Sequence, residues 1–306
     1  MTEGAVWPPA DRMRPQFSER GDMSKKETDD SSGGFNFYGP QYSRFGTPLA
    51  LELRREVYGE DVGQQGWRTT AEQQQIAELV RPGPDTRVLD VACGSGGPAL
   101  ALVNRTGCRL IGLDIEPEGI AYANAQALAR GLAEQASFAV CDCSVRLPFA
   151  DNAFNVVLCI DAISHLRDRL QTLSDWARIA NRGGRVVFTD NFVLTGPIAK
   201  TDLDVRASVG FHLLVPPGVN ERFIEAAGLT LSYCEDHTAA VAEIASRWHT
   251  VRARSAPALI REEGTEWFEQ RQQFLAVTAE LAVSRRLSRF LYVAEKSMPR
   301  GGRGAI

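Results

Sequence analysis

The sequence lacks the features that mark membrane, secreted and zinc-binding proteins. None of its apolar runs approaches the roughly 20 residues that a transmembrane helix needs, and its beginning has no charged-then-apolar secretion signal. The 6 cysteines lie mostly in apolar, strand-like runs, and Cys141-x-Cys143 has no second pair at zinc spacing. We therefore expect a cytoplasmic protein with reduced cysteines, no membrane association and no metal site.

An excess of positive charge is missing as well. The chain of 306 residues has a formal net charge of −4, whereas nucleic-acid-binding domains usually carry a basic face. With 44% apolar and 24% charged residues, the composition is that of an ordinary globular protein with an ample core. The sequence therefore predicts no nucleic-acid partner and leaves a small molecule as the expected one.

The most informative stretch runs from Val88 to Pro98 and reads VLDVACGSGGP. An apolar run of strand length meets a glycine-rich turn, and a helical pattern follows, which predicts a parallel strand that feeds a helix. Such a turn lets a ligand approach the backbone, and the first amides of the helix can bind its polar end. Gly94-x-Gly96-x-x-Ala99 also fits the loose dinucleotide fingerprint, which is weak evidence by itself.

Two acidic residues narrow the class of ligand. Asp90 lies inside the otherwise apolar strand, where a carboxylate is costly without a partner. A second apolar strand, 110–115, contains Asp114 about 20 residues after Gly94. A carboxylate at that position can accept hydrogen bonds from both hydroxyls of a ribose.

These residues resemble the first motif of the class I S-adenosylmethionine (SAM)-dependent methyltransferases, which VLDVACGSG matches. The resemblance covers residues 69 to 296 and implies SAM as the cofactor. A nicotinamide-binding Rossmann domain is the main alternative, but such a site lacks an acid at the position of Asp90 and rarely has a proline like Pro98 in its helix start. A glycine turn with a purely structural role is the remaining alternative.

The resemblance implies contacts with the methionine part of SAM from residues around the first turn. Gly94, Ser95 and Gly96 would let the backbone approach it, and Asp90 would lie near its amino group. Ile160, at the end of the fourth predicted strand, would contact the cofactor through its backbone.

The adenosine part of SAM would have its own set of contacts. Asp114 would bind the ribose hydroxyls, and Ile115 would pack against the adenine face. Asp142 and the backbone amide of Cys143 would face the exocyclic amine of adenine, unless Asp142 is only a turn residue at a strand end. Gln65, in a turn-rich loop ending at Trp67, is a further expected cofactor contact.

Candidate catalytic groups follow the fourth predicted strand, on the edge that faces the ligand crevice. His165 has a side chain with a near-neutral reference pKa, so it can accept a proton from an amine or hydroxyl. Asp161 lies four residues earlier and shares a face with His165 if the segment is helical. The structural alternatives are a histidine bonded to a backbone carbonyl and an aspartate that caps a helix.

The same segment resembles the phosphoethanolamine methyltransferases, which have Arg-Asp-Ala-Ile-Leu-His here, with Ile160 and Ser164 as the departures. Residues 37–42 are similar to the Phe-x-Gly-x-x-Tyr entry segment of that family. The resemblance implies that Tyr38 or Tyr42 closes the site together with His165 and assists proton removal. The alternative is that these aromatic residues only cover the sheet.

Strand and helix patterns alternate from residue 69 onward, which predicts right-handed crossovers and a parallel sheet covered on both faces. The expected fold is an α/β, Rossmann-like, seven-stranded and mostly parallel sheet with helices on both faces. The class resemblance makes the last strand, 289–294, antiparallel. The predicted strands are 88–91, 110–115, 138–143, 154–161, 185–189, 229–233 and 289–294.

The domain organisation follows from shifts in composition along the chain. Residues 1–34 and 297–306 are polar or rich in glycine and arginine, and we expect disordered tails. Residues 35–68 are expected to form an aromatic lid segment, ahead of a methyltransferase domain over 69–296. Within that domain, 191–217 is expected to be an irregular insertion and 238–263 an extra helical one, both on the substrate side.

The function predicted from these features is methyl transfer from SAM to nitrogen or oxygen of a small organic molecule, in specialised metabolism. The first alternative is a C-methyltransferase acting on an alkene or prenyl diphosphate, for which Asp161, Tyr38 and Arg206 could supply a base, an aromatic ring and a cation. The second is a non-catalytic SAM-binding scaffold. A homodimer is one option for the assembly.

Overall fold

The structure is a computed structural model, and it describes residues 38–297. The tails expected at 1–34 and 297–306 lie outside the described residues, apart from Ser297, and so do residues 35–37 of the expected lid segment. Within the described part of the chain, no helix combines the length and the apolar character that crossing a membrane requires.

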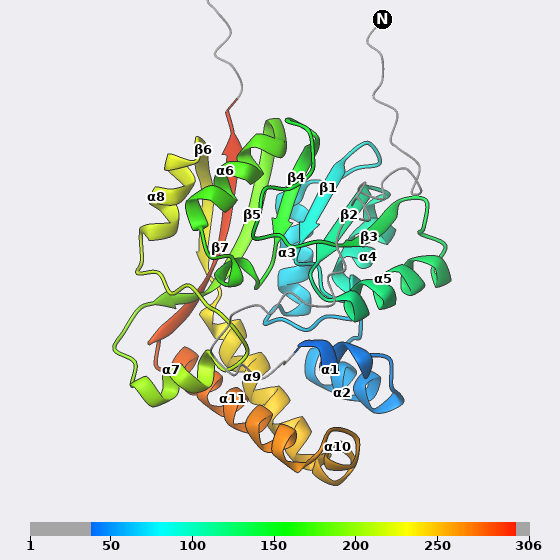
Figure 1. Ribbon diagram of the computed structural model, residues 1–306, viewed down its shortest axis with the longest axis vertical. Coiled ribbons are helices and arrows are strands. Elements are labelled where there is room, and N and C mark those ends of the chain that lie inside the picture. The colour runs from blue at the N-terminus through cyan, green and yellow to red at the C-terminus, as the bar shows by residue number, and fades with distance from the viewer. Residues whose placement is uncertain (1–37, 298–306) are drawn as a thin grey trace, which may run out of the picture.

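A seven-stranded sheet forms the centre of the molecule (Figure 1). Its strands are β1 (Arg87–Val91), β2 (Arg109–Asp114), β3 (Ala136–Val140), β4 (Phe154–Cys159), β5 (Ala180–Leu194), β6 (Leu229–Asp236) and β7 (Leu287–Lys296). They are ordered β3-β2-β1-β4-β5-β7-β6, with β1 to β5 parallel and β7 antiparallel to both of its neighbours. This confirms the expected fold class, including the antiparallel last strand.

Helices cover both faces of the sheet and bury an apolar core on each. One core lies under α3 (Thr70–Val80), α4 (Gly97–Thr106) and α5 (Pro117–Ala129). The other lies under α6 (Arg169–Ile179) and α8 (Val219–Ala226). Connections of this kind place the strand ends that carry ligand-binding loops on one edge of the sheet.

A second group of helices lies beneath that edge in Figure 1, and we call it the helical cap. The cap consists of α1 (Tyr38–Ser43), α2 (Pro48–Tyr58), α7 (Lys200–Arg206), α9 (Thr238–Arg254), α10 (Ala256–Glu263) and α11 (Thr265–Val283). It has a core of its own, to which α2, α9 and α11 contribute. Helices α9 and α10 span 238–263, where the sequence predicted an extra helical segment, and the role of this segment as a substrate-side insertion stays a prediction.

The segment 191–217 is more regular than the sequence indicated, so the expectation of an irregular insertion was wrong. β5 continues to Leu194 because it keeps pairing with β7 after a register shift between Asp190 and Val193. Helix α7 follows, and Val215 then returns to form a parallel bridge with Val193. A seven-residue helix is too short to show a clear helical period in the sequence.

Candidate functional site

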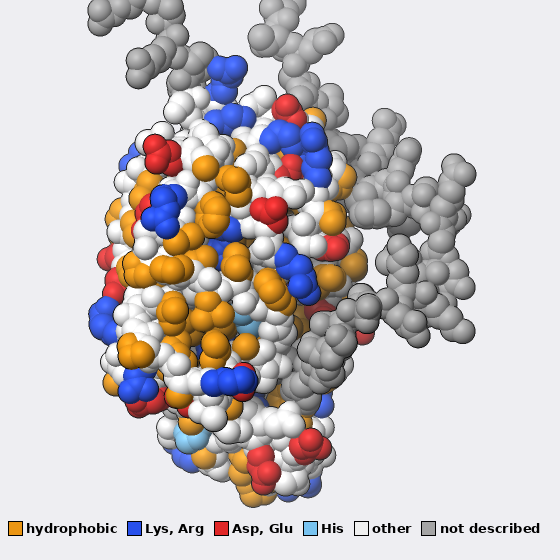
Figure 2. Space-filling model, turned by 60° about the vertical axis from the view of Figure 1, so that its left-hand side comes forward, with side chains coloured by type: hydrophobic (Ala, Val, Ile, Leu, Met, Phe, Trp, Pro, Cys, Tyr) orange, Lys and Arg blue, Asp and Glu red, His pale blue; other side chains and the backbone are white. Residues whose placement is uncertain are grey.

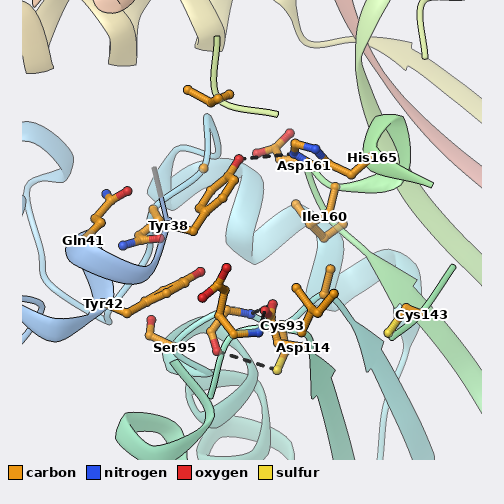
Figure 3. Close-up of a pocket in the computed structure, with 18 of the residues that line it drawn as sticks. Tyr38, Gln41, Tyr42, Cys93, Ser95, Asp114, Cys143, Ile160, Asp161 and His165 are labelled. Carbon is orange, nitrogen blue, oxygen red and sulfur yellow. Dashed lines mark hydrogen bonds between the residues drawn. The ribbon is translucent and has the colours of Figure 1, made fainter. Parts of the chain in front are cut away.

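A cavity of about 480 Å³ opens where the carboxyl ends of β1, β2 and β4 meet the helical cap. The predicted site residues converge on it from both halves of the chain (Figure 3). Those that line it are Tyr38, Tyr42, Gln65, Asp90, Gly94, Ser95, Asp114, Ile115, Asp142, Cys143, Ile160, Asp161 and His165. Gly96 is the predicted residue that does not.

The turn after β1 has a backbone conformation that glycine adopts most readily. Gly94 has φ 58° and Gly96 has φ 70°, both in the left-handed region. A Cβ on Gly96 would meet the side chains of Ala123 and Phe138 at 2.7 and 2.8 Å. Gly96 therefore allows α4 to approach α5 and β3, which differs from the cofactor contact predicted for it.

The loop that precedes α3, residues 60–68, is docked on this turn, and we call it the lid loop. The Ser95 hydroxyl donates to the carbonyl of Gly63 at 2.9 Å. A Cβ on Gly97 would collide with the carbonyl oxygen of Val62, so the loop sits where a side chain would otherwise be. The third glycine of the motif thus makes room for the lid loop.

Asp114 braces the glycine turn from the end of β2. Its carboxylate accepts hydrogen bonds from the backbone N–H of Gly94 at 2.8 Å and of Glu116 at 2.9 Å. Burial raises the pKa of Asp114, and the amide bonds act in the opposite direction. Ile115, the next residue, is 62% exposed and lines the cavity, so it presents an apolar surface to a ligand.

Asp142 behaves in part as the turn residue of the alternative interpretation. Its Oδ1 accepts hydrogen bonds from the backbone N–H and the hydroxyl of Ser144, at 2.8 and 2.6 Å. β3 ends at Val140, so Asp142 and Cys143 belong to the loop after the strand. Both still line the cavity, and their contact with adenine stays a prediction.

Asp90 lines the cavity with a carboxylate that, within the described residues, accepts no hydrogen bond. Burial raises its pKa from 3.8 to about 7, and the positive charge of Arg68 partly offsets that effect. Arg68 lines the same cavity and was missed in the sequence, because nothing local sets it apart. The Asp90 carboxylate could bind a cationic group of a ligand, such as an ammonium. Arg68 could bind a carboxylate group of the same ligand.

Tyr38 and His165 meet across the cavity, as Figure 3 shows. The Tyr38 hydroxyl and His165 Nε2 are 3.2 Å apart, and His165 Nδ1 is 2.9 Å from the carbonyl oxygen of Phe211. Because a carbonyl can only accept, Nδ1 carries the hydrogen and Nε2 is left to accept. The Phe211 loop is held in turn by the N–H of Leu213, which donates to the Ser164 carbonyl at 2.7 Å.

The pair is uncharged at neutral pH. Burial lowers the pKa of His165 to about 4 and raises the pKa of Tyr38 to about 12. The tyrosine therefore keeps its proton, and its hydroxyl donates a hydrogen bond to the unprotonated Nε2 of the histidine. Tyr42, one turn further along α1, lies against the glycine turn instead, 2.6 Å from where a Cβ on Gly94 would be.

Asp161 joins the sheet to the lid loop rather than standing beside His165. One carboxylate oxygen accepts from the Trp67 backbone N–H at 2.8 Å. The other accepts from the Thr189 hydroxyl at 3.0 Å and forms an ion pair with Arg289 at 2.5 Å. The single turn η2 (Ile163–His165) begins after Asp161, so the two predicted catalytic residues do not share a helical face.

Two buried arginines, Arg206 of α7 and Arg271 of α11, line the cavity on the side of the helical cap. From the sequence, Arg206 is predicted only as a cation for a diphosphate, and Arg271 is not predicted at all. A signal existed for Arg271, because it lies four residues after Trp267 and three before Phe274. A lone cation on an apolar helix face is unusual enough to mark a site.

Residues 89–188 match a family described as a methyltransferase domain. Methyltransferase GfsG of Streptomyces halstedii is 32% identical over 117 residues, which are 38% of this chain and 42% of that protein. A sterol 24-C-methyltransferase of Gibberella zeae is 28% identical over 200 residues, 63% of this chain and 51% of that protein. The chain thus spans about half the length, or less, of these curated relatives.

Solved structures share the fold over most of the chain. A phosphoethanolamine N-methyltransferase of Haemonchus contortus, solved in complex with SAM, has a TM-score of 0.71 and 18% identity to this chain. The likeness covers 87% of this chain and 61% of that one. At this identity it bears on the fold alone.

Proposed function

Because this chain carries a class I SAM-dependent methyltransferase domain, we propose that it transfers the methyl group of SAM to a nitrogen or oxygen atom of a small organic molecule. The observation that carries the proposal is the Tyr38–His165 pair, which lies across the same cavity as the glycine turn and Asp114. Its support includes the methyltransferase relatives and the SAM-bound structure with the same fold.

The cavity residues fit SAM at both of its ends. Asp90 would hold the ammonium group and Arg68 the carboxylate, which gives each buried charge a partner. Each carboxylate oxygen of Asp114 accepts one backbone N–H and has a further lone pair, with which it would accept from the ribose hydroxyls. Ile115 would pack against adenine. When bound, SAM supplies a sulfonium methyl group that is transferred as the S–C bond breaks, with the electron pair staying on sulfur.

The chain contributes alignment, exclusion of water and removal of a proton. The lid loop covers the cofactor side, and Asp161 holds it to the sheet through the Trp67 N–H. The acceptor nitrogen or oxygen loses its proton to Nε2 of His165, directly or through the Tyr38 hydroxyl. We assign Asp161 to positioning, because both of its carboxylate oxygens are occupied by donors.

Calorimetry with S-adenosylhomocysteine (SAH), run beside NAD and NADH, tests the cofactor assignment. We expect SAH alone to bind, and Asp114→Ala to weaken it because charge-assisted hydrogen bonds worth roughly 1.5–3 kcal/mol each are lost. Glu118→Ala is the matched control, since this exposed acid in the first turn of α5 lies outside the cavity. Binding of the nicotinamide cofactors, or unchanged SAH affinity in Asp114→Ala, would contradict the assignment.

Binding of SAH should also depend on pH through Asp90. A ligand ammonium favours the carboxylate form, whereas in the empty cavity burial holds the pKa of this group at about 7. The affinity should therefore rise from pH 6 to pH 8 by up to about tenfold per unit below that pKa, with a proton released on binding. Titrations in buffers of different ionisation enthalpy measure the release. Asp90→Asn should bind more weakly and lose both effects, and an equally pH-dependent variant would point to another group.

Transfer to carbon is the second candidate, favoured by the sterol 24-C-methyltransferase relative. Such a reaction passes through a carbocation, which the ring of Tyr38 in the cavity wall would stabilise. The assay that separates the two candidates is turnover with and without magnesium. A strict magnesium requirement would favour a diphosphate acceptor, and full activity in a chelator would favour simple transfer to nitrogen or oxygen.

A further inference from the structure

We propose that the cap side of the cavity is an oxyanion subsite built on Arg206, so that the methyl acceptor carries a carboxylate or phosphate group on an apolar body. The proposal rests on the proposed function only where it names the bound anion as the acceptor. The subsite itself follows from the burial, surroundings and charge of the arginine.

Arg206 is buried, with 2% of its surface exposed, yet it lines the cavity at the end of α7. Its guanidinium carbon lies over the rings of Phe192 at 4.1 Å, Phe274 at 5.2 Å and Trp67 at 5.6 Å from their centroids. These rings fix the plane of the guanidinium and give it modest electrostatic support. They cannot neutralise a full positive charge.

No carboxylate forms an ion pair with Arg206 within residues 38–297. The neutral side-chain amide of Asn191 lies beside Arg206. With the amide oriented so that its oxygen accepts, this oxygen is 3.2 Å from Arg206 Nη2 and 2.7 Å from Trp67 Nε1. The carboxylate of Asp161 acts on the charge of Arg206 only through space, and it forms its ion pair with Arg289 instead. Burial lowers the pKa of Arg206 to about 10, so it remains charged at neutral pH. A buried charge with only a neutral partner is costly, and a ligand anion would remove that cost.

A second cation extends the positive region. The guanidinium of Arg271 lies 5.7 Å from the centroid of the Phe274 ring that Arg206 also contacts. Burial lowers the pKa of Arg271 to about 9, which leaves it charged as well. Two planar guanidinium groups around one ring suit the planar or tetrahedral oxygens of carboxylate or phosphate.

The cavity is therefore divided by charge. Four acidic side chains line the end near the glycine turn, where Arg68 also lies. Arg206 and Arg271 line the end near the helical cap, while the Asp161 carboxylate is paired with Arg289. The acids are Asp90, Asp114, Glu116 and Asp142. On the face that Figure 2 shows, Lys and Arg lie among Asp and Glu, so the positive end is not the continuation of a basic surface there.

Much of the remaining cap-side lining is apolar or aromatic, with Gln41 and Asn191 as polar members. Trp67, Val209, Phe211, Trp248 and Phe274 all line the cavity. An acceptor that fills this space needs an apolar body, with its anionic group toward Arg206 and its nucleophilic atom toward His165. A cationic group at the cap end would face two guanidinium charges and is disfavoured.

Calorimetry with three probes of similar shape tests the subsite: phenylacetate, phenyl phosphate and the neutral phenylacetamide, each titrated with and without saturating SAH. We expect the anions to bind wild type at least roughly tenfold more tightly than the amide, because a charge-assisted contact is lost in the amide. The tighter of the two anions tells carboxylate from phosphate. Arg206→Gln should abolish the preference, and Arg206→Lys should keep part of it.

Arg130→Gln, which removes an exposed charge at the C-terminal end of α5 outside the cavity, is the matched control and should keep the full preference. The affinity of Arg206→Gln for SAH reports whether the variant is folded. Equal affinity of wild type for anion and amide, or the absence of binding by all three probes, would overturn the proposal without any variant. Failure of SAH to bind wild type is a separate result that concerns the proposed function.

Discussion

Replacement of Arg289 by methionine should lower the free energy of unfolding by roughly 3–5 kcal/mol, the cost of leaving buried charges without their partner. Arg289 is fully buried and forms ion pairs with Glu72 at 2.7 Å and with Asp161 at 2.5 Å. Methionine has a similar length but no charge, so two buried carboxylates would face each other across an apolar side chain. Chemical denaturation followed by circular dichroism measures the loss.

The loss of stability in Arg289→Met should be smaller at low pH than at high pH. In wild type, burial alone would raise the pKa of Glu72, but Arg289 and His237 hold it down at about 2. Its contribution to stability is therefore present above the usual pKa of a glutamate and is lost only as the pH falls toward 2. Without Arg289 the carboxylates would take up protons more readily, so the variant should be less impaired at pH 5 than at pH 8.

Arg254→Met is the matched control, because Arg254 also pairs with a glutamate, Glu56, but both side chains are largely exposed. Exposed pairs contribute about 0–1 kcal/mol. A loss in Arg289→Met as small as in this control, or one that does not change with pH, would show that the two carboxylates find other partners. Binding of SAH should also weaken in Arg289→Met, because Asp161 would no longer be fixed beneath the lid loop.

His165→Ala should lower kcat for methyl transfer by roughly 10²- to 10⁴-fold, the usual range for loss of a general base. The affinity for SAH should stay unchanged, since Figure 3 shows His165 and Asp114 on opposite sides of Ile160. Transfer from methyl-labelled SAM to the acceptor isolated from extracts measures the effect. Because burial lowers the pKa of His165 to about 4, its protonation should reduce the wild-type rate only below about pH 5.

His249→Ala is the control, since this half-buried histidine of α9 does not line the cavity. Tyr38→Phe should have a smaller effect than His165→Ala if the tyrosine orients the ring, and an equal one if it relays the proton. A His165→Ala enzyme within about threefold of the wild-type rate would instead make the pair a structural contact. That would revive the simpler interpretation in which the histidine only bonds the carbonyl of Phe211.

The cofactor side of the cavity could be predicted from the sequence because its signals are local. A strand, a glycine turn and an acid at the end of the next strand follow one another, and parallel strands bring their ends to one edge. Asp90, Gly94 and Asp114 accordingly line one cavity, and their contacts with the cofactor stay predictions. Gly96 does not line the cavity. A glycine in such a turn can serve helix packing as well as ligand binding, and the sequence pattern does not tell the two apart.

The acceptor side could not be predicted in the same way, because its residues gain their roles from distant partners. Asp161 was interpreted as a base, yet its ion-pair partner Arg289 lies 128 positions later in the chain. Thr69 caps α3 by accepting a hydrogen bond from the Glu72 N–H, whereas the Glu72 carboxylate pairs with the distant Arg289. The neighbouring residues in the sequence do not indicate that second partner.

The division of the cavity has a bearing on how this protein could have diverged from its relatives. The family match ends at residue 188, inside β5, and the arginines of the cap side come after that point, on α7 and α11. The two arginines that would select the acceptor are thus encoded outside the matched segment that carries the glycine turn and Asp114. Mutations could accumulate around these arginines, and new acceptors arise, while the inherited machinery for SAM stayed in place.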